Sequence, residues 1–330
     1  MNEDGTFPSN TKYQPYRVSE NSIAGTVEKI ESDVKLPNTR IPSTPETGTE
    51  SSSGSMGTEW NVDEQDSLLE SVMCSRWHTE TLTEEDDEAG ITERKTLMLG
   101  GSSASFAVKR DVYQMIKKYS QTPPEYQLFK GVQVNQLTID MALNSFVKMS
   151  WDLLGGNHPQ IVTTDPSTYG YEDPLTTKSF KTLEGYIKYG DDFEDIENFD
   201  ALRQVPNFSL TINNNKERTD ALFETEAIEM SDGDFNVSGN IEVWRAGQKA
   251  RDLTNEGITG AHKCFEICVS RQYVDGDDTK ETSYKIQLKV HLDDSTESKD
   301  GNKLKNTIPF TLDSADGLKF IKEVRTITED

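Results

Sequence analysis

The stretch YQLFKGVQVNQLTIDMALNSFVKMSWDLLGG occupies residues 126–156 and gives the strongest structural signal in the chain. Apolar and polar residues alternate in its first half, and the alternation resumes after Asn144 and Ser145. A period of two places each set on one face of a β-strand, and Asn-Ser is suitable chemistry for the turn between two strands. We therefore predict a β-hairpin with one apolar and one polar face. Its apolar face is formed by Leu137, Ile139, Met141, Leu143, Val147, Met149, Trp151 and Leu153.

Similar alternation recurs on both sides of the hairpin. The segment YKIQLKVHL, residues 284–292, alternates without interruption. Gly239 interrupts another alternating run, where we expect a bulge or a close backbone contact. The remaining predicted strands cover residues 104–111, 183–189, 208–212, 235–243, 264–269, 307–312 and 320–327. Many short strands indicate a mainly β fold, a sandwich or a half-barrel.

One helix is predicted before the hairpin. Asp63 is placed to cap it, and acidic residues follow in its first turn. Its apolar stripe has helical spacing, so one flanking helix should close a side of the β core. The stripe consists of Leu68, Leu69, Val72, Met73 and Trp77.

The domain prediction is an N-terminal arm over residues 1–25 followed by one β domain over residues 26–330. Long loops are expected at about 36–58, 80–104 and 157–180. The first of these loops is rich in Pro, Gly, Ser and Thr, and it is either a solvent-exposed linker or a segment that becomes ordered against another subunit.

The chain has 330 residues, of which 33% are hydrophobic, and its net charge is −24. Such an acidic chain repels phosphate backbones, which argues against sequence-specific nucleic-acid binding. We expect no membrane-spanning segment and no secretory signal. Cys264 and Cys268 lie four residues apart in a predicted strand, which separates their Cα atoms by roughly 13 Å. A disulfide needs less than about 7 Å, so we predict that these cysteines and Cys74 are reduced and buried.

The sequence contains none of the motifs that would indicate an enzyme: no phosphate-binding loop, dinucleotide loop, nucleophile elbow or HExxH pair. Cys74 and His78 have the spacing of two zinc ligands on a helix, but no second pair lies nearby in the sequence. We therefore expect no catalytic residues, no metal and no cofactor.

The order of these elements resembles that of the major tail tube proteins of long-tailed, siphovirus-type bacteriophages. The resemblance extends over residues 20–328, although each motif in it is short. The matching motifs are WNVD leading into LLESVM (60–63 and 68–73), FKGVQVN (129–135), Gly155 with Gly156, SLTINNN (209–215), FNVSGNIEVW (235–244) and GNKLKNTIPFTL (301–312).

This resemblance implies a structural virion protein that is made in the bacterial host cytoplasm and self-assembles into stacked hexameric rings. Each subunit would add strands to a β-barrel around the bore through which genome DNA is ejected. Implied partners are other copies of the chain, a tape measure protein and tail-end proteins. The polar face of the hairpin would then line the bore, and its candidate lumen-facing residues are Gln136, Asp140, Lys148 and Asp152.

Two other interpretations remain open at this point. The chain could be a β-sandwich binding module, such as a virion decoration or carbohydrate-binding adhesin domain, with its tyrosines and long loops as the contact surface. An acidic hydrolase is the third, and its only support is the surplus of carboxylates.

Overall fold

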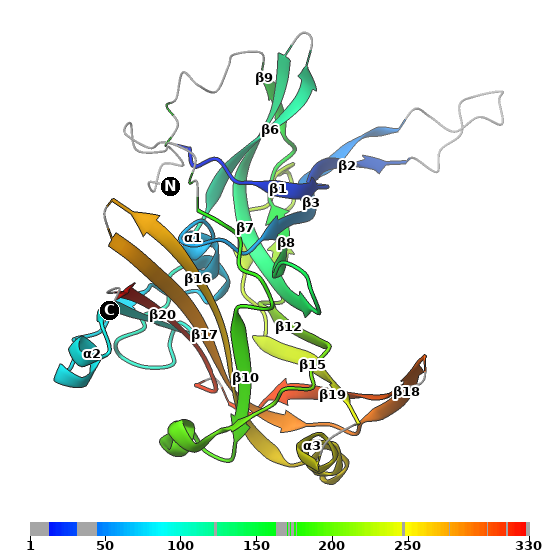
Figure 1. Cartoon of the computed structure of the whole chain (residues 1–330). Coiled ribbons are helices and arrows are strands. Elements are labelled where there is room, and N and C mark those ends of the chain that lie inside the picture. The colour runs from blue at the N-terminus through cyan, green and yellow to red at the C-terminus, as the bar shows by residue number, and fades with distance from the viewer. Residues whose placement is uncertain are drawn as a thin grey trace, which may run out of the picture.

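The computed structural model describes residues 13–327 except 32–44, 122–123, 163–169, 171, 173–174, 176, 246–247, 277, 302 and 315. The chain is mainly β, as predicted, and its described strands form one large antiparallel sheet that folds into two layers (Figure 1). A separate two-stranded hairpin consists of β13 (Glu217–Thr219) and β14 (Glu229–Ser231).

The first layer contains the predicted hairpin at its centre. Antiparallel pairing gives the order β2–β3–β8–β7–β12–β15–β19–β18, and β1 also pairs with β3. The bounds are β1 (Val18–Asn21), β2 (Ala24–Ile30), β3 (Glu46–Glu59), β7 (Pro124–Ala142), β8 (Lys148–Gly155), β12 (Asn207–Asn213), β15 (Asn236–Trp244), β18 (Thr296–Asp300) and β19 (Lys303–Leu312). The long β7 also pairs through its first residues with β6 (Tyr113–Gln121) and β9 (Gln160–Val162).

The second layer has the order β10–β16–β17–β20–β5–β4, with β11 beside β10. One strand joins the two layers, because β17 pairs with β20 over most of its length and with β19 at its end. The bounds are β4 (His78–Thr79), β5 (Ile91–Met98), β10 (Gly185–Gly190), β11 (Asp200–Ala201), β16 (His262–Asp275), β17 (Asp278–Leu292) and β20 (Leu318–Ile327).

The hydrophobic core lies between the layers and contains the apolar face of the hairpin. Leu137 and Ile139 on β7 are fully buried opposite Trp151 and Met149 on β8. Leu143 is an exception. It lies in the turn just after β7 and is 61% exposed, so its assignment to the buried face was wrong.

The helix α1 (Asp66–Val72) covers the edge of the core as expected, and Leu68, Leu69, Val72 and Met73 are buried. Its N-cap is Gln65, however, and not Asp63. Asp63 has a positive φ of 66° in the preceding turn, and its carboxylate binds Lys322 on β20. A long-range ion pair therefore occupies the side chain that the sequence assigned to local capping.

The loop expected at 36–58 is wrong over residues 46–58, which belong to β3. Its residues are mostly small and polar, and hydrogen bonding to β2 on one side and β8 on the other holds them extended. Gly54 is needed there because a Cβ would lie 2.5 Å from the Cα of Ile23. Residues 36–44 lie outside the described residues.

The other loop and arm predictions need similar corrections. Within 80–104, Thr83 and Asp86 form a capping box that starts α2 (Glu84–Glu88), and β5 follows. Within the predicted arm, residues 18–21 pair with β3 as β1, while residues 1–12 lie outside the described residues. Within 157–180, the described residues include the short strand β9.

The strand predicted over 104–111 is wrong, because this segment is a loop in which the backbone of Lys109 donates to Cys74 O. Several elements have no counterpart in the sequence predictions. Among them are β2, β6, the β13–β14 hairpin and α3 (Gln248–Thr259).

Candidate lumen and assembly surfaces

The four candidate lumen-facing residues form two cross-strand pairs on one face of the sheet. Gln136 on β7 lies opposite Asp152 on β8, and Asp140 lies opposite Lys148. This face is opposite to the core face, since the buried Leu137 and Ile139 alternate with them along β7. The structure brings the four side chains together, and their position in a bore stays a prediction.

The same polar face continues across the neighbouring strands of the first layer. Each strand contributes alternate residues that lie in register with the hairpin. Most of them carry a hydroxyl or an amide: Ser55 on β3, Ser150 on β8, Thr138 on β7, Ser209, Thr211 and Asn213 on β12, Ser238 and Asn240 on β15, and Thr307 and Thr311 on β19. We call this surface the polar wall.

Charged residues on the polar wall are few and mostly engaged. Ser209 Oγ donates to Asp140 Oδ1 at 2.7 Å, and Lys305 Nζ contacts Glu242 Oε1 at 2.9 Å. Partial burial raises the pKa of Asp152 above its ordinary value. The wall is therefore only mildly acidic, and the large negative charge of the chain is carried mainly by other surfaces.

A group of exposed apolar side chains lies at the tip of the hairpin. Leu143, Phe146 and Leu183 are 61%, 42% and 68% exposed. Backbone contacts hold this tip, because Thr182 N donates to Ser145 O at 3.0 Å and Phe146 forms a bridge with Lys181. Exposed apolar groups of this kind mark contact surfaces.

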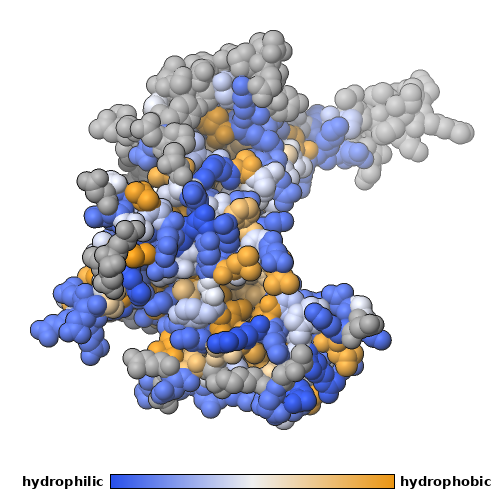
Figure 2. All heavy atoms as spheres, viewed as in Figure 1, coloured by the Kyte–Doolittle hydropathy of each residue, from blue (hydrophilic) through white to orange (hydrophobic). Residues whose placement is uncertain are grey.

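The visible face of the whole molecule also carries hydrophobic residues, which gather in a hollow of an otherwise largely hydrophilic surface (Figure 2).

The first layer has unpaired edges among the described strands. On one side β1 and β2 pair only with β3, and on the other side β18 pairs only with β19. All five residues of β18 are exposed. Such edges carry free backbone donors and acceptors, so they are ready to pair with another chain.

The described residues contain no group of three or more His, Cys, Asp or Glu placed to hold a metal ion. The ring of His78 packs edge-on against that of Phe106, with 6.0 Å between the two ring centroids, and Cys74 is buried. All three cysteines are free and buried, as predicted, and burial raises the pKa of Cys268 to about 12. Such a thiol stays protonated and unreactive at neutral pH.

None of the helices in the described part of the chain is long and apolar enough to cross a membrane. The surface of the described residues includes shallow cavities of about 240 Å³ and about 160 Å³. The larger one opens at one end of the core.

Comparison with known families supports the first of these interpretations. A family model described as "Phage tail tube protein" matches residues 4–256, which is more than half of the chain. The chain belongs to the phage tail tube protein family. A search of curated proteins gave no match.

Membership makes this tail tube protein a structural component of a phage tail, and its mainly β fold agrees with that role. The sequence had identified the polar face through the hairpin alone. It missed the polar contribution of β3, because a Ser- and Gly-rich stretch has no apolar alternation to mark a strand. The exposed tip was also missed, since Leu143 continues the apolar pattern by one residue beyond the strand.

Proposed function

We propose that the tail tube protein self-assembles into stacked hexameric rings whose bore conducts genome DNA during ejection. The observation that carries this proposal is the first layer itself, a two-faced sheet with a polar wall on one face, the core on the other, and an unpaired edge on each side. A barrel that closes across subunits pairs those edges and leaves the polar faces toward water.

Strand direction supports closure by rotation. The eight positions β2, β3, β8, β7, β12, β15, β19 and β18 alternate in direction, because every neighbouring pair is antiparallel. Rotation about the bore keeps each strand's direction along the axis. In the proposed ring, β18 of one subunit therefore meets β1 and β2 of the next in an antiparallel arrangement, as in the rest of the sheet.

The polar wall suits a conduit for DNA because it offers little for phosphates to bind. Hydroxyl and amide groups predominate on it, and its acidic residues outnumber its basic ones. A hexamer would carry a formal charge of −144, six times the −24 of one chain. Screening acts over about 8 Å at physiological salt, so only charges close to the bore act on the passing duplex.

Stacking of rings needs a contact along the axis. The β2–β3 hairpin extends beyond the rest of the first layer in Figure 1 and would provide such a contact. Further proposed partners are the tape measure protein and the proteins at the tail ends, with assembly in the cytoplasm of the bacterial host.

Electron microscopy of the purified chain at rising concentration tests this proposal. We expect rings and stacked tubes, and symmetry averaging of end-on views should give six subunits. A chain that stays monomeric at all concentrations in sedimentation would contradict self-assembly. It would favour the alternative of a β-sandwich binding module, whose exposed loops contact a different partner.

A further inference from the structure

We propose that Leu222 and Phe223 form an apolar knob that inserts into the larger cavity of a neighbouring copy of the chain. This inference rests on the proposed self-assembly and assigns one of its contacts. Leu222 is 86% exposed and Phe223 is 101% exposed, the most exposed of the large apolar side chains described. A fully hydrated aromatic ring is costly in water and gains free energy when another surface covers it.

The knob is presented by a firmly anchored loop between β13 and β14. Thr225 O accepts from Glu50 N on β3 at 2.7 Å, and Ala227 N donates to Gly156 O just after β8. Arg218 also donates to Glu50 O. These contacts tie the loop to two central strands, so the knob is positioned before any partner arrives.

The backbone at the knob adds to this picture. Phe223 has a φ of 72°, which bulky residues seldom adopt. Residues held in such a conformation concentrate where a side chain must point in a required direction. Here the conformation leaves the ring of Phe223 in solvent and not against its own chain.

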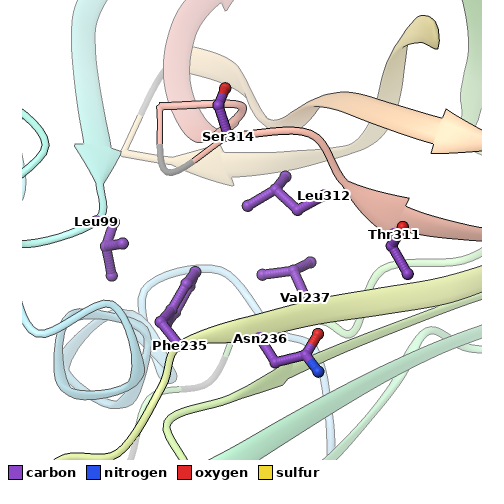
Figure 3. Close-up of a pocket in the computed structure, with 7 residues that line it drawn as sticks. All are labelled: Leu99, Phe235, Asn236, Val237, Thr311, Leu312 and Ser314. Atoms are coloured by element: carbon purple, nitrogen blue, oxygen red, sulfur yellow. The ribbon is translucent and has the colours of Figure 1, made fainter.

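The receiving cavity has the size and chemistry that an aromatic ring requires. It is an open depression of about 240 Å³, and even an enclosed apolar cavity of about 150 Å³ has room for benzene. Its apolar lining comes from three parts of the chain that meet at the end of the core (Figure 3). Leu99 follows β5, Phe235 precedes β15, Val237 lies at the start of β15, and Leu312 ends β19.

The mouth of the cavity is accessible. Asn236, Thr311 and Ser314 surround it and are exposed, whereas Leu99, Phe235 and Leu312 are partly buried against the core. The cavity is therefore a depression with an apolar floor and a polar rim, which is the usual form of a pocket that receives an anchor side chain.

A knob and a pocket at different places on one chain generate a head-to-tail contact. Such a contact closes into a ring when the rotation permits, and otherwise it continues as a filament. A tube of stacked rings uses both kinds of contact. The occupant of the cavity is the knob of a second copy, because every copy supplies one knob and one cavity. Assembly then fills every cavity and covers every knob along the tube, except at its ends.

Cross-linking between two different chains tests the contact directly. Phe223→Cys and Ser314→Cys are made in separate chains that carry different tags, mixed, and treated with a short bismaleimide. The native cysteines are buried and should not react. We expect a cross-linked product that carries both tags. Replacing Phe223→Cys by Val274→Cys gives the control, because Val274 is 74% exposed on a different hairpin and should give no such product.

A variant carrying Leu222→Ser and Phe223→Ser supplies the second test, with Val274→Ser as its matched control. We expect the concentration needed for assembly to rise at least about tenfold in the double variant only, since buried aromatic anchors dominate interfaces. If the wild type forms tubes while the double variant assembles equally well and no mixed product appears, the knob contact is rejected and the proposed function stands. A wild type that never associates rejects both.

Discussion

Lys322 shows how a single buried charge ties distant parts of this protein together. Its side chain is only 6% exposed, and its Nζ contacts Asp66 Oδ2 at 2.5 Å and the carboxylate of Asp63. Tyr284 donates to the other oxygen of Asp66 at 2.6 Å. The start of α1 is therefore held to β17 and β20 by hydrogen-bonded charges. Because these charges are partly buried, breaking the contacts costs considerable free energy.

We predict that Lys322→Met lowers the free energy of unfolding by about 3 kcal/mol, because it leaves two carboxylates beside the core without their cation. Urea unfolding at neutral pH measures the change. Arg245→Met is the control, since Arg245 and Glu297 are 44% and 51% exposed and such pairs contribute at most about 1 kcal/mol. Equal losses in the two variants would contradict the prediction.

The stabilisation that Lys322 provides through Asp66 and Asp63 depends on pH. Burial lowers the pKa of Lys322, but Asp66 and Asp63 together outweigh burial and raise it above 10.5. A raised lysine pKa stabilises the folded state fully below the unfolded value, and this contribution is lost as the pH rises through the folded value. The difference in stability between wild type and Lys322→Met should therefore shrink above about pH 10.5. A difference that grows there would show that the assignment is wrong.

At the scale of elements, the first layer depends on close packing between β12, β15 and β19. Gly239 lies on the core face of β15, opposite Leu210 on β12 and Phe310 on β19. The ring of Phe310 lies over it, and a Cβ at position 239 would be 2.4 Å from Phe310 Cζ and 2.2 Å from Ser209 O. Because Gly239 has no side chain, the ring of Phe310 can pack directly over the backbone of β15.

We predict that Gly239→Val destabilises the protein by about 1–3 kcal/mol, because the side chain overpacks a site that lacks room for it. Thermal and urea unfolding measure the loss. Ser238→Val on the adjacent residue, which faces the polar wall, serves as the control and should stay within about 0.5 kcal/mol of the wild type. A Gly239→Val protein as stable as the control would show that Phe310 moves aside without cost.

At the scale of the whole molecule, the distribution of charge decides how the tube would treat DNA. The polar wall carries Asp140 and Asp152 among mostly neutral groups and a few other charged residues, such as Lys148, while most carboxylates lie elsewhere. Replacing both aspartates by lysine would shift the charge of the proposed hexameric bore by +24, four charges for each of six subunits. Cations at that density would bind phosphates along the passing duplex.

We predict that Asp140→Lys with Asp152→Lys slows or blocks DNA ejection without preventing tube assembly. Ejection triggered in vitro and measured by the release of DNA tests this, with electron microscopy as the check on tubes. The control is Asp140→Asn with Asp152→Asn, which removes charge without adding cations and should eject nearly normally. Unchanged ejection in the lysine variant would place these residues outside the bore.

The sequence by itself determined the elements whose signal is local. Alternation identified the hairpin and most of the later strands, the stripe from Leu68 to Met73 identified α1, and the order of motifs pointed to the tail tube family. These features could be read because faces with a period of 2 or 3.6 are properties of one short segment.

Only the tertiary structure decided the features that depend on neighbours distant in the chain. Residues 46–58 form a strand because β2 and β8 supply its hydrogen bonds. The side chains of these residues show no apolar alternation from which a strand could be predicted. Asp63 does not cap α1, because its carboxylate binds Lys322, which lies near the other end of the sequence. Long-range strand pairing also decides three further features: the register of the polar wall, the unpaired edges, and the separation of the Phe223 knob from its cavity. Such pairing produces no periodic pattern in the sequence of the paired segments.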